Sequence, residues 1–204
     1  MIGVYRGTLD MGEVARLSFV LAIMTLQALT MAGASPSQTR YENLGDRFGM
    51  GLNGLGSGFL PLLCFTTTWI DFANYAPATF QFWTGLGLSL AGLTVFWRAH
   101  QDLGRNFSKF VEIKQDHKLI TTGIYRYVRH PLYAGLVLLA AGQGFLIANW
   151  LVGPAALIGF LVVYLLRIPN EEAVLEAKFG QEYTDYAQQT GRLFPRLLGA
   201  GPAR

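Results

Sequence analysis

Long stretches without a charged side chain are the feature that most limits what this chain can fold into. The 204-residue sequence contains four of them, at residues 17–39, 48–70, 72–97 and 131–166. A helix needs about 20 consecutive, mostly apolar residues to cross the hydrocarbon core of a bilayer. The last stretch is long enough for two such helices. The sequence therefore predicts an all-α, polytopic integral membrane protein with about five transmembrane helices.

These helices are expected near residues 14–32, 54–70, 79–98, 131–148 and 150–167. The segment 100–130, between the third and fourth helices, is rich in Lys and Arg, whereas residues 71–79 and the turn at Asn149 contain neither. Lys and Arg accumulate in cytoplasmic loops. We therefore expect this segment and the carboxyl terminus in the cytoplasm and the amino terminus outside, an orientation that agrees with five crossings.

The first apolar segment also permits a second interpretation. A basic start, an apolar stretch and the small residues Ala32, Gly33 and Ala34 are typical of a secretory signal peptide with a cleavage site. The leading segment is long for a signal peptide and carries Asp10 and Glu13. These features favour a retained membrane helix.

The fourth and fifth helices are expected to form a hairpin, because only Ala148, Asn149 and Trp150 separate them. Small residues on both arms would allow a close approach of the two backbones. Beyond the hairpin, apolar side chains recur at helical spacing through Leu175, Phe179, Tyr183 and Tyr186, with Gly180 between them. We expect one bent or two short cytoplasmic helices here, lying against the membrane domain.

The composition excludes several classes of protein. Hydrophobic residues make up 51% of the chain, charged residues 14%, and the net charge is only +3, which argues against a disordered tail and a nucleic-acid-binding protein. Cys64, the single cysteine, has no partner for an internal disulfide. The three histidines lack ligand spacing, so no metal site is expected. The glycine cluster at residues 49–58 lacks the context of a phosphate loop and is expected to be a flexible or close-packed entry to the second helix.

Polar residues suited to chemistry gather on the expected cytoplasmic side. Pro131 fits the first turn of a helix, which would hold Arg129 and His130 at the mouth of the fourth helix, where backbone N–H groups favour an anion. Glu171 follows Arg167 by four residues, so on a continuing helix the two would flank one cavity. Asn170 would instead cap a new helix, and the other groups would serve as helix caps or interface anchors. The residues alone leave these alternatives open.

The ordered set of motifs resembles the isoprenylcysteine carboxyl methyltransferase family and its prokaryotic relatives, which adjoin the phospholipid methyltransferases. The resemblance rests on Gly123-x-Tyr125, Arg129-His130-Pro131-x-Tyr133-x-Gly135, Glu171-Glu172, and Phe179-Gly180-x-Glu182-Tyr183-x-x-Tyr186 before Phe194-Pro195. It covers about residues 106–195 and implies an integral membrane enzyme, expected in a prokaryotic inner membrane. It divides the chain into an amino-terminal transmembrane part, residues 1–98, and a catalytic half, residues 99–204.

The resemblance further implies S-adenosylmethionine as the cofactor, with S-adenosylhomocysteine as the product, bound on the cytoplasmic side. Residues carried over to the wall of the nucleoside site are His117, Lys118, Leu119, Ile120 and Tyr125. Those carried over to the amino-acid end or to adjacent cofactor atoms are His130, Pro131, Leu132 and Tyr133, and Glu171 would be a further cofactor contact. Arg167 would face the methyl acceptor, and Arg129 and Glu172 belong to the catalytic motif without an assigned role.

The chemistry of methyl transfer is compatible with these residue types. An in-line displacement at a sulfonium needs alignment, exclusion of water and a reactive acceptor. A carboxylate with a reference pKa of about 4 is already ionised near neutrality, so it needs no general base, and an arginine such as Arg167 can orient it. The apolar helices suggest a lipophilic or amphiphilic acceptor that enters from the bilayer.

Two other functions remain compatible with the sequence. A membrane sterol-type reductase would bind NADPH and would need a basic site for the 2′-phosphate, for which Lys114 and Lys118 are the candidates. A non-catalytic membrane scaffold would use the same motifs only as helix caps and interface anchors. The scaffold would tolerate Glu171→Gln and Arg167→Lys, whereas a transferase would not.

Overall fold

The computed structural model describes residues 44–104 and 119–196, and helices provide all the regular structure longer than an isolated bridge in these two ranges. In chain order the elements are α2 (Leu44–Gly54), the π-helix η1 (Leu55–Phe59), α3 (Leu60–Thr66), the 3₁₀-helix η2 (Asp71–Ala73), α4 (Thr79–Leu103), the 3₁₀-helix η4 (Gly123–Arg126), α5 (Pro131–Leu146), α6 (Val152–Phe179) and α7 (Gln181–Gln189). The predicted all-α class is confirmed for this part of the chain. The first expected transmembrane helix, residues 14–32, lies outside the described residues.

The second expected helix was predicted at residues 54–70, and its boundaries are wrong. Helical structure runs without a break through α2, η1 and α3, from Leu44, the first described residue, to Thr66. It ends because Thr67 adopts an extended conformation (φ −131°, ψ 172°). Within the glycine cluster, Gly56 packs directly on the backbone of Ala155. Gly49 likewise packs on Val163, whereas Gly51 and Gly54 have no atom within 4 Å of an added Cβ, so the close-packed alternative holds for Gly49 and Gly56.

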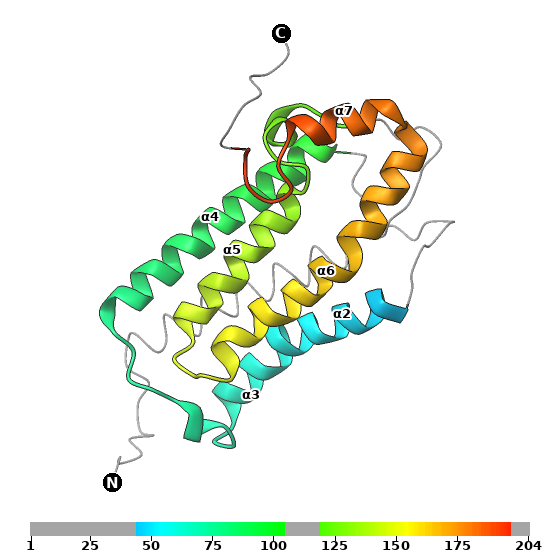
Figure 1. Ribbon diagram of the computed structural model, residues 1–204. Coiled ribbons are helices and arrows are strands. Elements are labelled where there is room, and N and C mark those ends of the chain that lie inside the picture. The colour runs from blue at the N-terminus through cyan, green and yellow to red at the C-terminus, as the bar shows by residue number, and fades with distance from the viewer. Residues whose placement is uncertain (1–43, 105–118, 197–204) are drawn as a thin grey trace.

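α4 and α5 lie side by side and antiparallel (Figure 1). Their backbones approach closely because small residues line the contact, and a Cβ atom added to Gly92 would lie 2.8 Å from the carbonyl oxygen of Gly135. Ser89, one turn before Gly92, is 1% exposed and packs on Gly142. The predicted use of small residues for close packing on α5 is confirmed, with α4 as a partner that the sequence did not identify.

The predicted hairpin of α5 and α6 is also confirmed, and Asn149 holds its turn together. Asn149 is 1% exposed, and its Nδ2 donates hydrogen bonds to the Ile70 carbonyl at 2.9 Å and to Asn74 Oδ1 at 2.7 Å. Its Oδ1 accepts the N–H groups of Leu151 and Val152, each at 3.0 Å. The same side chain thus caps the start of α6 and fixes the connection that follows α3.

One bent or two short helices were expected here, and the break at Gly180 is present, with α7 after it; the part before Gly180 is not a separate short helix, because α6 continues past Pro169 to Phe179. The expectation that Asn170 caps a new helix is wrong, because its Nδ2 donates to the Leu166 carbonyl one turn back. The helix ends at Gly180, whose φ of +55° suits glycine. This continuation brings Arg167 and Glu171 onto one face, the alternative that the sequence had left open.

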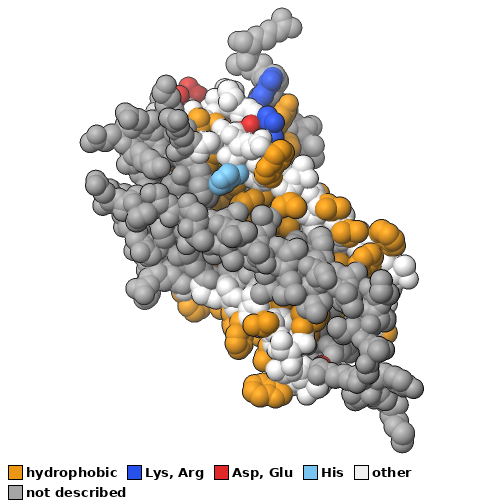
Figure 2. All heavy atoms as spheres, turned by 180° about the vertical axis from the view of Figure 1, so that it is seen from behind, with side chains coloured by type: hydrophobic (Ala, Val, Ile, Leu, Met, Phe, Trp, Pro, Cys, Tyr) orange, Lys and Arg blue, Asp and Glu red, His pale blue; other side chains and the backbone are white. Residues whose placement is uncertain are grey.

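Charged and apolar side chains are separated along the helices. Within the described ranges, α6 is the one helix long and apolar enough to cross a membrane by length and composition, and α5 is a shorter apolar helix. The apolar part of α6 ends at Leu166, and its polar continuation begins at Arg167. On the face drawn in Figure 2, Lys, Arg, Asp and Glu side chains lie mostly at the upper end, and hydrophobic side chains cover the flank and the lower end.

Candidate active site

The start of α5 places His130 at the end of the helix where the polar side chains meet. Pro131 occupies the first helical position, where its missing N–H costs no hydrogen bond. His130 has a non-helical backbone (φ −123°, ψ 60°), its carbonyl accepts the N–H of Ala134 at 3.0 Å, and its side chain is 6% exposed. The structure therefore confirms that Arg129 and His130 lie at the start of this helix, as predicted.

Glu171, on the polar continuation of α6, receives hydrogen bonds from two helices. Its Oε1 accepts the Tyr133 hydroxyl at 2.7 Å and the Nε–H of Arg167 at 2.8 Å. Its Oε2 lies 3.9 Å from His130 Nδ1, beyond hydrogen-bonding distance. Among the described residues, none lies within hydrogen-bonding distance of this second oxygen as a donor, so it can still accept a hydrogen bond.

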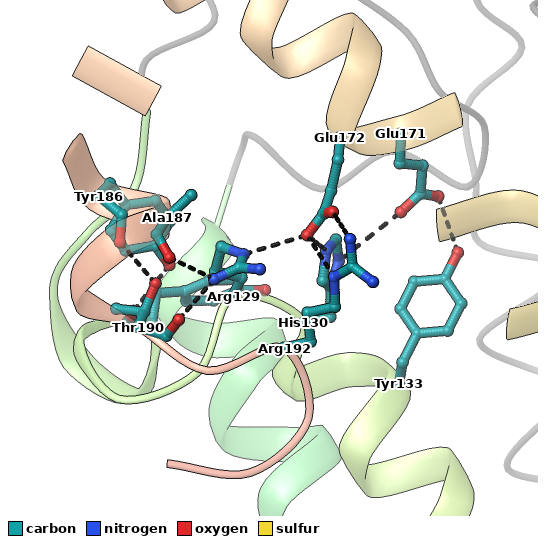
Figure 3. A network of polar contacts seen from close by, with 10 residues as sticks. Arg129, His130, Tyr133, Glu171, Glu172, Tyr186, Ala187, Thr190 and Arg192 are labelled. Atoms are coloured by element: carbon teal, nitrogen blue, oxygen red, sulfur yellow. Dashed lines mark hydrogen bonds and ion pairs between the residues drawn. The ribbon is translucent and has the colours of Figure 1, made fainter. Parts of the chain in front are cut away.

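The neighbouring Glu172 forms the centre of a second group of contacts (Figure 3). Its Oε1 lies 3.0 Å from Arg129 Nε and 3.3 Å from His130 Nε2, and its Oε2 accepts a hydrogen bond from Arg192 Nη2 at 2.6 Å. The side chains of Arg129 and Glu172 are 10% and 15% exposed. The two charged side chains can be buried because they pair with each other, whereas an unpaired buried charge would be strongly destabilising.

Arg129 also fastens the segment after α7 to the start of α5. Its Nη1 donates to the carbonyl oxygens of Ala187, at 2.7 Å, and of Thr190. The backbone beside it forms two further bonds, from Arg129 N–H to the Gly191 carbonyl at 2.8 Å and from His130 N–H to the Arg192 carbonyl at 3.0 Å. The guanidinium therefore joins three parts of the chain and holds His130 and Glu172 in register.

Asp102, near the end of α4, is a residue that the sequence analysis missed. Its Oδ2 accepts the N–H of Ile124 at 2.8 Å, and its carboxylate pairs with Arg98 at 3.1 Å. Gly123 has a φ of +61° and lies against this carboxylate, leaving no room for a side chain. Asp102 thus holds the η4 turn that positions Tyr125. The spacing of Arg98 and Asp102 on one helix was visible, but their partner lies 22 residues further along the chain.

Glu172 and Tyr186 both lie outside the apolar helix segments and have shifted pKa values. Burial alone would raise the pKa of Glu172, but hydrogen bonds from His130, Arg192 and Arg129 lower it from 4.5 to about 2. Burial raises the pKa of Tyr186 to about 12, and its hydroxyl donates to the Tyr125 carbonyl at 2.7 Å. Glu172 is therefore an anion and Tyr186 a neutral donor throughout the physiological range.

The predicted site residues fall into three groups. His130, Tyr133, Arg167 and Glu171 come together around one carboxylate, and Arg129 and Glu172 form the adjoining ion pair. The second group lies near the same end and consists of the half-buried Leu119, Ile120 and Leu132 and the buried Tyr125 and Pro131. The side chains of this group make no polar contact among those described. His117, Lys118 and the reductase candidate Lys114 lie outside the described residues.

The arrangement offers contacts for a ligand that carries an ammonium group and a carboxylate. Glu171 Oε2 offers an acceptor for an ammonium group, and the first turn of α5 presents backbone N–H groups that lack intrahelical acceptors, which suits a carboxylate. Among the described residues, no group of three or more His, Cys, Asp and Glu side chains has the arrangement to hold a metal ion.

Comparisons with known proteins identify relatives of this chain. Residues 85–177 match the model of the Isoprenylcysteine carboxyl methyltransferase (ICMT) family. Protein-S-isoprenylcysteine O-methyltransferase B from Arabidopsis thaliana is 33% identical over 125 residues, which are 56% of this chain and 61% of that protein. The Protein-S-isoprenylcysteine O-methyltransferase from Dictyostelium discoideum is 34% identical over 144 residues, 67% of this chain and 59% of the relative. The chain thus spans less than two thirds of the length of these two relatives.

A solved structure has a similar fold over most of the chain. It is the structure of the eukaryotic intramembrane Ras methyltransferase ICMT (isoprenylcysteine carboxyl methyltransferase) without a monobody, and the likeness has a TM-score of 0.60 at 25% sequence identity. The match covers 95% of this chain and 71% of that one. The intramembrane relative supports the membrane class predicted from the sequence. The relatives named here are eukaryotic, so they lend no support to the prokaryotic source that was expected.

Proposed function

The chain belongs to the isoprenylcysteine carboxyl methyltransferase family, with residues 85–177 as the matching part, and on this premise we propose that it methylates the carboxylate of a lipophilic, isoprenylcysteine-like acceptor. The methyl donor is S-adenosylmethionine. The reaction takes place at the cytoplasmic face, where the bias of Lys and Arg places the segment that precedes α5. The observation that carries the proposal is the meeting of Tyr133, Arg167 and His130 around the carboxylate of Glu171.

The cofactor would be held by Glu171 and by the start of α5. Glu171 Oε2 would accept a hydrogen bond from the ammonium group of the cofactor, while hydrogen bonds from Tyr133 and Arg167 to Oε1 fix the orientation of the carboxylate. When bound, S-adenosylmethionine supplies an electrophilic methyl group on a sulfonium. Tyr125 and the half-buried Leu119 and Ile120 form the apolar side of the nucleoside site.

Arg167 orients the acceptor. It follows the last apolar residue of α6, and its Nε–H bond to Glu171 fixes the orientation of the guanidinium beside that carboxylate. A planar guanidinium can hold one carboxylate oxygen and leave the other in line with the methyl group. The acceptor carboxylate is already ionised, so no side chain has to remove a proton.

Arg129 and Glu172 have a positioning role. Their contacts are made with each other, with His130, with Arg192 and with two backbone carbonyls, and none of these partners is a reacting group. They hold His130 and the segment after α7 against the start of α5. The motif residues thus divide between those that touch the ligands and those that fix the ligand-binding residues.

The proposal is tested first by calorimetric titration of S-adenosylhomocysteine into the detergent-purified protein. Saturable binding is expected in the wild type, and Glu171→Gln should weaken it about tenfold or more, because a neutral amide replaces the anion that pairs with the ammonium group. Glu176→Gln is the matched control, since Glu176 is an exposed glutamate on the same helix. Equal affinities in both variants would contradict the assignment of Glu171.

Two further titrations separate the competing functions. NADPH binding in place of S-adenosylhomocysteine would favour the reductase, and binding of neither ligand to folded protein would favour the scaffold. The acceptor is tested with an S-prenylated cysteine that carries a free carboxylate, compared with its amide. Methyl transfer to both compounds at the same rate would rule out the carboxylate as the acceptor.

A further inference from the structure

Exposed aromatic side chains gather at the end of the molecule away from the polar cluster around Glu171 and Glu172. We call this group the aromatic platform, and its members are between 63% and 80% exposed: Trp69, Phe72, Phe80, Trp83 and Trp150. They come from the connection after α3, the first turns of α4 and the turn between α5 and α6. These elements lie at the lower end of the molecule in Figure 1.

The platform is a fixed surface, because backbone bonds join the two connections that carry it. The N–H of Tyr75 donates to the Ala148 carbonyl and the N–H of Trp150 to the Ala73 carbonyl, both at 3.0 Å. The rings of Tyr75 and Trp150 lie 4.7 Å apart, centroid to centroid. The buried Asn149 lies between these bonds. The aromatic side chains are therefore held outward by the fold and are not the tips of loose loops.

The platform carries almost no charge, which fits the boundary region of a bilayer and not open water. In residues 67–83 and 147–151 the one charged side chain is Asp71, and its Oδ1 already accepts a hydrogen bond from Asn74 at 3.2 Å. The surface continues without a break in sequence into α4 and α6, whose exposed side chains Leu90, Ile158 and Leu165 suit acyl chains. Trp and Tyr are enriched where headgroups meet acyl chains, and indole N–H groups find partners there.

An opposing aromatic side chain marks the other boundary. Trp97 on α4 is 59% exposed, and it follows Phe96, which packs on Gly135 in the second turn of α5. Trp97 therefore lies level with the polar cluster. At 1.5 Å per residue, Trp83 and Trp97 are about 21 Å apart along α4, and the 16 residues of α5 measure about 24 Å. Both lengths are shorter than the hydrocarbon core of a typical bilayer, about 30 Å.

We propose that the aromatic platform docks in the headgroup boundary of the leaflet opposite the polar cluster, and that Trp97 marks the other edge of an apolar belt only about 21 to 24 Å thick. The occupant of this surface is the lipid bilayer itself. The protein then fits a thin bilayer, and in a thicker one it draws the headgroups inward toward the cluster. This inference concerns the membrane contact and does not depend on methyl transfer.

The first test reconstitutes the wild-type protein in phosphatidylcholine bilayers of graded acyl length and measures the temperature of unfolding by circular dichroism. The unfolding temperature should be highest in bilayers with a hydrocarbon core thinner than about 30 Å and should fall as the acyl chains lengthen. An unfolding temperature that is unchanged by thickness, or that rises through the longest chains, would overturn the proposal. This arm needs no variant.

The second test locates the platform by fluorescence. A variant that retains Trp150 alone, with Trp69, Trp83 and Trp97 changed to Phe, is placed in bilayers whose lipids are brominated near the headgroup or near the chain end. Emission should be quenched most by the bromines near the headgroup and little by aqueous iodide. Strong iodide quenching without lipid quenching would mean that the platform faces water or a soluble partner, and the proposal would fail. Because all four tryptophans are placed near a boundary, the unmodified protein should show the same preference for shallow bromines.

Discussion

The Nε atom of Arg129 and the Oε1 atom of Glu172 lie 3.0 Å apart, although 43 positions separate the two residues in the chain. This ion pair joins the start of α5 to the polar continuation of α6. Through Nη1 of the same guanidinium it also reaches the carbonyls of Ala187 and Thr190. The pair is therefore the point at which three separate parts of the catalytic half are held together.

Arg129→Lys should destabilise the protein by about 2 kcal/mol, because an ammonium group cannot serve Glu172 and two carbonyls in the same planar geometry and leaves buried acceptors unpaired. The measurement is the free energy of unfolding, or the unfolding temperature, in detergent. Arg126→Lys is the control, since Arg126 is exposed at the end of η4. Equal stability in the two variants would show that the network around Arg129 contributes nothing.

Tyr133→Phe should reduce kcat/KM about fivefold, because it removes the hydroxyl that donates to Glu171 at 2.7 Å while leaving the ring in place. A hydrogen bond of this kind contributes about 1 kcal/mol, or roughly a factor of five. Methyl transfer and cofactor affinity are measured together, and the loss should appear in both. Tyr127→Phe, at an exposed position, should leave both unchanged.

Arg167→Lys should raise the KM for the acceptor about tenfold and should weaken the binding of S-adenosylhomocysteine by a smaller factor, because it also removes the Nε–H bond to Glu171. The lysine keeps the positive charge but loses the planar pair of donors that orients a carboxylate. Steady-state kinetics and calorimetry on the same preparation separate the two effects. A loss of cofactor affinity as large as the rise in KM would move Arg167 from the acceptor to the cofactor.

Gly123→Ala should destabilise the η4 turn by about 1–2 kcal/mol, because φ at this position is +61° and a side chain would collide with Asp102. The loss should be visible in the unfolding temperature and in cofactor affinity, since the turn carries Tyr125. Gly87→Ala is a matched control on α4, where an added Cβ meets no atom within 4 Å. That control should be neutral or slightly stabilising.

The stability of the wild type should fall more steeply with acid than that of Glu172→Gln. The folded-state pKa of Glu172 is lowered from 4.5 to about 2, so its contribution to stability is complete above pH 4.5 and is lost as the pH falls toward 2. Unfolding temperatures between pH 6 and the acid limit of the folded state check this. Parallel curves for the two proteins would show that the paired carboxylate does not contribute.

The sequence determined the elements whose signal is local. Uncharged stretches predicted helical membrane segments, Pro131 predicted the start of α5, and Gly180 predicted an interruption between Phe179 and Tyr183. The four-residue spacing of Arg167 and Glu171 was also a local signal. Whether the helix continues across Pro169 could not be read from the sequence, because proline disfavours a helix interior and packing overrides that preference here.

Only the tertiary structure decided which distant residues meet. In the folded chain Glu172 pairs with Arg129 and Arg192, and the Ile124 N–H donates to the carboxylate of Asp102. The segment after α7 lies against His130. Periodicity and capping preferences act over a few residues and fix the helices. The partners of buried charges are fixed by the packing of whole helices, which sequence spacing does not encode.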